Sequence, residues 1–153
     1  KLVPGIVGFR SNEDIWDMRS DRMNLPEDAS RFEFTTLHFG ALRGLAASIE
    51  EMLEIGIERI WEHDLSLSDM VVELASSRGL EVTSPKDDDQ RSAIVSIRPP
   101  SEHHSAEIVR RLQDEFGILV TDRSGMIRVS PHIDNDHSQI EFLFTSLDKI
   151  LAN

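Results

Sequence analysis

The chain has 153 residues and no cysteine, and its 16 basic and 28 acidic side chains give a formal charge of −12. An acidic excess without a basic stripe argues against nucleic acid as a partner, because clustered Lys and Arg bind phosphate backbones. No run approaches the roughly 20 apolar residues of a membrane-spanning helix. Without cysteine there is no disulfide, thiolate metal site or cysteine nucleophile. We therefore expect a soluble, cytoplasmic protein that binds neither nucleic acid nor membrane.

Residues 1–38 follow no regular pattern. After an apolar stretch over 2–9, the segment 11–30 is polar and has neither a helical period nor the alternation of a strand. So long a structureless stretch is uncommon inside a compact domain. We predict an extended leader over 1–38 that packs on something this chain lacks, followed by an α+β domain over 39–153.

Two helices are predicted next. Apolar residues at helical spacing predict an amphipathic helix over 39–63. Gly44 and Gly56 weaken it by about 1 kcal/mol each relative to Ala. A second helix is predicted over 66–78, with Ser66 or Ser68 as its N-cap and Gly79 at its end.

After residue 79, the spacing of apolar residues changes from the helical period to the alternation of strands. Strands are predicted over 80–84, 92–98, 118–121 and 126–130, with a helix over 104–116 before the third. Residues 122–125 form the predicted turn between the last two strands, and Asp134, Asn135 or Asp136 caps a final helix. Because short loops join neighbouring elements, we expect an α+β fold with a small antiparallel or mixed sheet and helices on one face.

Histidines and acidic residues gather before the final helix. His132, Asp134, Asp136 and His137 offer four possible metal ligands within six residues, yet helix capping explains most of them. The pair His103-His104 lies at a helix start, where adjacent side chains diverge. We predict no metal site.

Arg128 lies at the centre of the predicted strand 126–130. An arginine there is usually paired, since an unpaired buried charge is costly, and its planar fork also suits a ligand carboxylate. The sequence leaves an intramolecular salt bridge and ligand binding open. Likewise Thr35-Thr36 could cap the first helix or bind a phosphate.

Three stretches in register resemble one family. They are the segment RFEFTT over 31–36, the helix from Gly44 to the EIGIERI motif over 54–60, and IRVSPH over 127–132 with Asn135. Together they resemble the C-terminal part of class V aminotransferase-like enzymes, the fold type I pyridoxal-phosphate (PLP) proteins. Within that group they look most like the isopenicillin-N-epimerase-like branch.

The resemblance implies a small C-terminal domain and the segment that leads into it. The large domain, with the Schiff-base lysine and the aspartate facing the pyridine nitrogen, would precede Lys1, which is itself a poor candidate for that lysine. The leader would cross the active-site region and contact the large domain and the partner of a homodimer. No catalytic residue is then expected on this chain.

Two residues match functional positions of the family. Arg128 matches the arginine that pairs with the α-carboxylate of the substrate, and Thr36 matches the threonine that reaches the PLP phosphate of the neighbouring subunit. Asn135 matches an asparagine at a helix start, where capping is favoured over catalysis. Thr35 replaces the usual glycine, and Asp134 and Asp136 replace a tyrosine and a threonine.

The resemblance implies a PLP-dependent enzyme that acts on an amino acid by transamination, epimerisation or lyase chemistry. The short turn 122–125 leaves no room for the cysteine-bearing loop of one group of cysteine desulfurases, and the absence of cysteine argues against persulfide transfer. The alternative is a stand-alone α+β module that binds amino acids or a protein partner without catalysis.

Overall fold

A computed structural model describes residues 2–152, so Lys1, and the prediction made for it, lies outside the described residues. Contacts divide the chain into two compact units, one up to Glu51 and one from Met52 onward. Among the described residues, none of the helices is long and apolar enough to cross a membrane.

The first unit is held together by polar groups. Apart from the 3₁₀ turns η1 (Phe9–Ser11) and η2 (Ala29–Phe32), its leader is irregular. The side chains it buries are those of Ser11, Asn12 and Arg31. The Arg31 guanidinium donates to the carbonyls of Glu27 and Asp28, and the Ser11 hydroxyl donates to the Glu33 carbonyl at 3.1 Å. The leader therefore has a hydrogen-bonded interior in place of an apolar one.

Helix α1 (Phe39–Ile55) begins after His38, whose Nδ1 accepts from the backbone N–H of Ala41 at 3.0 Å. His38 therefore provides the side-chain cap that was considered for Thr35-Thr36. No residue of α1 is buried. The apolar stripe predicted along it is largely exposed at Leu42, Leu45, Ile49 and Leu53.

The start of the first predicted helix and the end of the second agree with the structure, but the predicted break between them, at 63–66, is wrong. The first helix ends at Ile55, and α2 runs over Ile57–Ser77, so Ser66 and Ser68 lie inside a helix and cap nothing. The cause is Gly56, whose φ of 99° and ψ of 122° lie outside the helical region. Glycine adopts positive φ without steric penalty, and the chain uses that freedom to restart a helix after a single residue.

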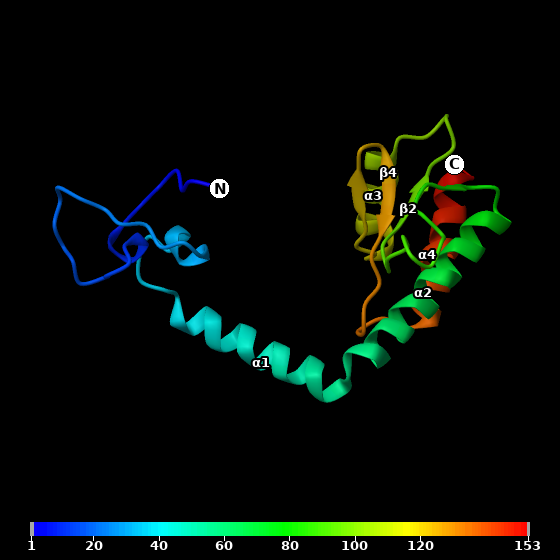
Figure 1. Ribbon diagram of the computed structural model, residues 1–153. Coiled ribbons are helices and arrows are strands. Elements are labelled where there is room, and N and C mark those ends of the chain that lie inside the picture. The colour runs from blue at the N-terminus through cyan, green and yellow to red at the C-terminus, as the bar shows by residue number, and fades with distance from the viewer. Residues whose placement is uncertain (1, 153) are drawn as a thin grey trace. The chain divides into compact units, whose positions relative to one another are not determined.

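The second unit contains a four-stranded antiparallel sheet in the order β1-β2-β4-β3. Its elements after α2 are β1 (Glu81–Val82), β2 (Val95–Arg98), α3 (Ser105–Phe116), β3 (Thr121–Arg123), β4 (Met126–Val129) and α4 (His137–Leu151). This arrangement confirms the predicted α+β class. Helices α2 and α4 lie side by side along the sheet (Figure 1).

The last hairpin is tighter than predicted. The third strand covers 121–123 instead of 118–121, and only Ser124 and Gly125 form the turn. Both turn residues have positive φ, 52° and 77°, which is typical of two-residue hairpins that match the twist of the strands. The pairing of Arg123 with Met126 and of Thr121 with Arg128 follows from this turn.

One face of the sheet carries the core. Val95, Ile97, Ile127 and Val129 point to that face and are buried against apolar residues of α2, α3 and α4, among them Leu67, Leu112 and Phe144. Because side chains alternate along a strand, Ser96, Arg98, Met126 and Arg128 lie on the opposite face. None of these four is buried. We call this opposite side, with the outward residues of β1 and β3, the open face.

Helix α4 starts as the sequence predicts, with an acidic cap. Asp136 is the N-cap and accepts from the Gln139 N–H at 3.0 Å, while the Gln139 side chain bonds back to the Asp136 N–H. Hydrogen bonds from the Ser138 hydroxyl and from the Gln139 N–H lower the pKa of the Asp136 carboxyl. Oδ1 of this carboxylate therefore accepts two hydrogen bonds from the first turn of α4.

Candidate functional site

Strand β4 places Arg128 at the middle of the open face. Its direct cross-strand neighbours are Ser96 on β2 and Thr121 on β3. Residues opposite each other in an antiparallel pair share a face, with Cβ atoms about 4.5–5.5 Å apart. Arg128 is thus flanked by two hydroxyl-bearing residues in one row across the sheet.

The Arg128 guanidinium has no partner among the described residues. No ion pair or hydrogen bond to it is formed within 2–152, and its Nε is buried without a hydrogen-bond partner. Most other arginines of this acidic chain are paired, for example Arg98 with Glu81 and Arg78 with Asp148. The sequence left two roles open for Arg128. No carboxylate within residues 2–152 forms a salt bridge with it, and binding of a ligand carboxylate stays a prediction.

The loop after β4 is linked to α2 by two hydrogen bonds. His132 Nδ1 lies 2.8 Å from Oδ2 of Asp64, a buried residue, and the backbone carbonyl of Asn135 lies 2.9 Å from Nε2 of His63. Asn135 closes the turn itself, since its Oδ1 accepts from the His132 N–H at 3.0 Å. The capping role that was favoured for Asn135 belongs to Asp136 instead, and Asn135 stabilises the turn before the helix.

Two of the four possible metal ligands before α4 have structural roles. His132 pairs with Asp64, and Asp136 caps α4. Within residues 2–152, no three His, Cys, Asp or Glu side chains come together in a group that could hold a metal ion.

Thr36 lies in the first unit, three residues before α1. The residue is exposed. Nothing in residues 2–152 hydrogen-bonds to its hydroxyl, because His38 caps the helix in its place. Its predicted role at a phosphate remains a prediction, with a hydroxyl that is free to donate.

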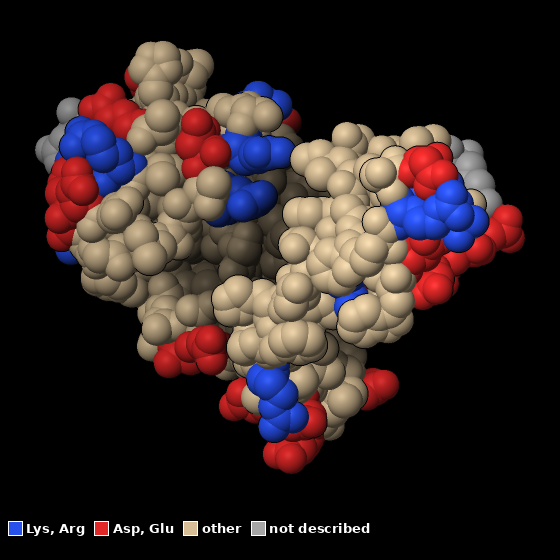
Figure 2. Space-filling view, turned by 90° about the vertical axis from the view of Figure 1, so that its left-hand side faces the viewer, with Lys and Arg blue, Asp and Glu red and all other residues tan. Residues whose placement is uncertain are grey.

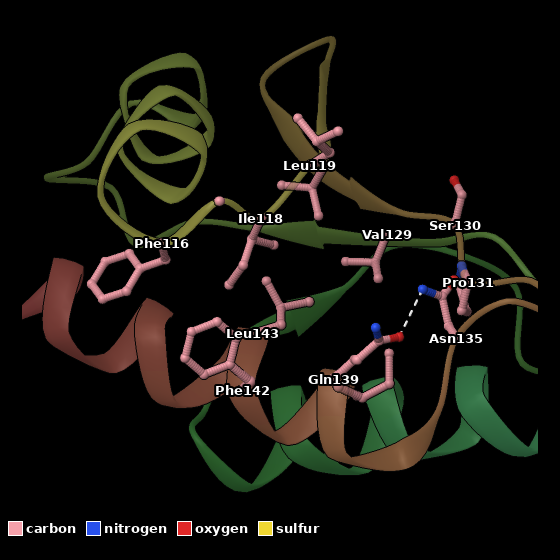
Figure 3. Close-up of a pocket in the computed structure, with 13 residues that line it drawn as sticks. Phe116, Ile118, Leu119, Val129, Ser130, Pro131, Asn135, Gln139, Phe142 and Leu143 are labelled. Atoms are coloured by element: carbon pink, nitrogen blue, oxygen red, sulfur yellow. Dashed lines mark hydrogen bonds between the residues drawn. The ribbon is translucent and has the colours of Figure 1, made fainter.

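A pocket of about 400 Å³ lies on the core side of the second unit (Figure 3). Its walls come from residues 116–120, the end of β4 and α4, and they are apolar except at one end. There Asn135 Nδ2 already donates to Oε1 of Gln139 at 3.0 Å. The pocket has no charged lining residue to bind an amino-acid carboxylate or ammonium group, and Arg128 points to the other face. The open face is therefore the candidate site.

Charges elsewhere on the surface lie close to charges of opposite sign. In the face seen in Figure 2, basic and acidic side chains lie side by side in small groups. Ion pairs among the described residues include those of Arg19 with Asp21, Arg22 with Asp17 and Arg110 with Asp114. This mixture offers no extended basic surface on the face shown.

Asp64 and His63, which hold this loop, were not predicted from the sequence. A signal for Asp64 does exist, because it falls on the stripe of α2 that contains the buried residues Ile60, Leu67 and Val71. A carboxylate on an apolar stripe needs a buried partner. Its partner comes from a loop 68 residues later, and the spacing gives no hint of that loop.

Comparison with known proteins identifies the family. A model of the class-V aminotransferase family matches residues 13–143. The chain belongs to this family, as the resemblance implied.

The relatives are longer than this chain and have several names. A probable cysteine desulfurase of Pyrococcus abyssi is 26% identical over 98% of this chain and 39% of its own length. A kynureninase of Geobacillus thermodenitrificans is 27% identical over 84% of the chain and 31% of its own length. The chain thus spans about two fifths or less of these relatives.

Solved structures have the same fold. The apo structure of a cysteine desulfurase from Thermococcus onnurineus matches 96% of this chain and 39% of its own, with a TM-score of 0.78 and 24% identity. A cystine C–S lyase with glycine linked covalently to its PLP cofactor matches 94% of this chain and 37% of its own, with a TM-score of 0.76 and 21% identity. These similarities show that the chain has the fold of one part of a fold type I PLP enzyme. The family uses PLP.

Proposed function

We propose that this chain is the C-terminal part of a PLP-dependent enzyme that acts on an amino acid, and that Arg128 binds the substrate's α-carboxylate. The observation that carries the proposal is the unpartnered guanidinium of Arg128, with its buried Nε, on the open face. An unsatisfied buried donor is costly unless a ligand completes it. A carboxylate matches the guanidinium fork with two parallel hydrogen bonds.

The contribution of this chain is binding and orientation. When bound, PLP supplies an electron sink that stabilises negative charge at the substrate α-carbon. Arg128 fixes one substituent of that carbon, so the remaining bonds are held in a defined direction. Ser96 and Thr121 beside it offer further hydroxyls to the same carboxylate.

Thr36 is the one residue proposed to touch the cofactor. Its exposed, unbonded hydroxyl fits one oxygen of a phosphate. Following the family resemblance, we propose that this phosphate belongs to the cofactor of the neighbouring subunit in a homodimer. The exposed apolar residues of the leader, among them Trp16, Met18 and Phe34, support a covered position for this segment on a large domain or a partner subunit.

The names of the relatives favour carbon–sulfur cleavage over epimerisation. They include cysteine desulfurases and a cystine C–S lyase, and none of those given above is an epimerase. The epimerase-like branch therefore has no support beyond the motif resemblance. Since the chain contains no cysteine, none of its own residues can carry a persulfide. A lyase fits both observations, because β-elimination removes the α-proton, breaks the Cβ–S bond and releases the sulfur with its electron pair as a thiolate or persulfide anion.

The test uses the full-length protein that contains this chain. Arg128→Gln should raise KM for amino-acid substrates by about 10- to 100-fold, because a hydrogen-bonded charge pair is lost, while the PLP content stays unchanged. Arg110→Gln removes an exposed arginine of α3, outside the sheet's open face, and should leave the kinetics unchanged. Equal KM values for Arg128→Gln and the wild type would remove the assigned role.

The alternative is a stand-alone module without catalysis. The closed apolar core of the second unit favours it, because such a core can fold without further domains. A full-length protein that binds an amino acid with neither PLP nor turnover would support the module and overturn the enzyme.

A further inference from the structure

A second arginine lies on the open face beside Arg128. Arg123 on β3 is paired with Met126, and Arg128 is paired with Thr121. Arg123 and Arg128 therefore occupy diagonal positions on one face of neighbouring strands, where Cβ atoms are about 7–8 Å apart. The tight turn at Ser124 and Gly125 fixes this register.

Arg123 has no ion pair or hydrogen bond to its guanidinium within residues 2–152. Its neighbour Asp122 points to the core face, where it accepts from the Ser105 hydroxyl at 2.6 Å. On the open face, Glu81 is taken by Arg98 at 2.7 Å. The carboxylates of Asp122 and Glu81 thus have other partners, and the two arginines on this face have none within residues 2–152.

This arrangement is notable in a chain with 28 acidic and 16 basic side chains. Carboxylates are in excess, yet the two guanidiniums have none. Two like charges at this distance repel each other. A ligand with two negative groups would satisfy both arginines and remove the repulsion.

Building on the proposed function, we propose that Arg123 binds a second acidic group of the substrate. The substrate class is then an amino acid with a carboxylate at the far end of its side chain. Arg128 binds the α-carboxylate, and Arg123 binds the distal one. Arg123 is thereby a specificity-determining residue, since an amino acid with a neutral side chain leaves it without a partner.

Steady-state kinetics of the full-length protein test this assignment. All the substrates have a carbon–sulfur bond: cystine and S-carboxyethylcysteine have a distal carboxylate, whereas cysteine and S-propylcysteine do not. The wild type should prefer the dicarboxylic set. Arg123→Gln should lower kcat/KM for that set by about 10- to 100-fold and change the other set less than about twofold. Arg110→Gln is the matched control and should change neither.

The outcomes separate the two proposals. If Arg128→Gln lowers kcat/KM for every substrate while Arg123→Gln affects both sets equally, only the second-acid assignment is overturned. A wild type that prefers neutral amino acids overturns it as well. If Arg128→Gln affects none of the substrates, the proposed function fails and the inference fails with it.

A binding measurement on the 153-residue chain gives an independent readout. In a titration followed by NMR of the arginine Nε–H signals, succinate should shift the signals of both Arg123 and Arg128. Propionate, which has one carboxylate, should shift Arg128 and leave Arg123 nearly unchanged. A succinate titration that leaves the Arg123 signal in place would overturn the assignment.

Discussion

Arg128 combines a central position in β4 with a guanidinium that no residue in 2–152 satisfies. A buried donor without a partner destabilises the folded state by about 1–3 kcal/mol relative to one that is bonded. Binding sites often contain such groups, since the ligand supplies the missing partner. The residue is therefore expected to reduce stability in the absence of a ligand.

Replacing Arg128 with a neutral side chain of similar length should stabilise the chain. We expect Arg128→Met to raise the free energy of unfolding by about 1 kcal/mol, because the unsatisfied Nε disappears while the aliphatic contacts remain. Urea unfolding followed by circular dichroism measures the change. Arg110→Met, at an exposed pair on α3, should change stability little. A loss of stability on Arg128→Met would instead reveal a structural role for the guanidinium.

The sequence predicted where Arg128 lies but not that it is unpaired. Alternation along Met126–Val129 is enough to assign its face. Whether a carboxylate reaches it depends on β1, which is distant in sequence and carries Glu81, and on the register of the β3–β4 hairpin, which places Asp122 on the core face. Local pattern carries no information about those directions, and the same holds for the contact between Asp64 and His132.

At the scale of the elements, the break between helices α1 and α2 could not be predicted from the spacing of apolar residues. The apolar period continues through Gly56, so periodicity alone predicts one helix over 39–63. The backbone of Gly56 lies outside the helical region. The low helix propensity of glycine was the one sequence feature that indicated a break at this position. The four strands were predicted, and of the antiparallel and mixed sheets left open the antiparallel one is observed. The order of the strands in the sheet was not predicted, and strand ends such as 118–121 shifted with the type of turn.

The C-terminal end of α2 is tied to α4 by an ion pair. Arg78 Nε and Nη2 donate to the two carboxylate oxygens of Asp148, both at 2.8 Å. The hydrogen bond from Arg78 lowers the pKa of Asp148 and, in turn, raises that of Arg78. The pair therefore links two core helices at the edge of their interface.

This pair makes stability depend on pH in a defined direction. Because the folded-state pKa of Asp148 is lowered, its contribution is present above the ordinary value of about 3.9 and is lost as pH falls through the lowered pKa. Asp148→Asn should lower the free energy of unfolding by about 0.5–1 kcal/mol near pH 7. That deficit should disappear at acid pH, as urea unfolding at several pH values would show.

A matched control separates this effect from the general loss of negative charge. Asp89 is exposed in a turn and its carboxylate forms no ion pair within residues 2–152, so Asp89→Asn removes the same charge without breaking a pair. Its effect should be close to zero at every pH. A deficit for Asp148→Asn that persists at acid pH would contradict the ion-pair explanation.

At the scale of the whole molecule, the apolar core belongs to one unit only. The core cluster consists of residues between Leu67 and Ile150, all in the second unit. The buried side chains of the first unit are polar, and its large apolar residues are mostly exposed. Folding free energy from apolar burial is therefore concentrated after Met52.

We expect a fragment of residues 52–153 to fold on its own and to unfold cooperatively, because it contains the entire core cluster. A fragment of residues 1–51 should remain unfolded, since hydrogen bonds alone do not offset the loss of chain entropy. Thermal unfolding followed by circular dichroism, together with NMR signal dispersion, measures both. A cooperative transition in 1–51 alone would contradict the polar-interior description of the leader.

The two edge strands of the sheet are short and charged, which affects how copies of the chain can associate. β1 has two residues and β3 has three, and charged side chains occupy both, at Glu81, Asp122 and Arg123. Short, charged edge strands resist the strand-by-strand addition that builds fibrils. The large exposed apolar side chains lie mainly in the leader and along α1. Self-association would then proceed through these side chains and give amorphous aggregates instead of amyloid.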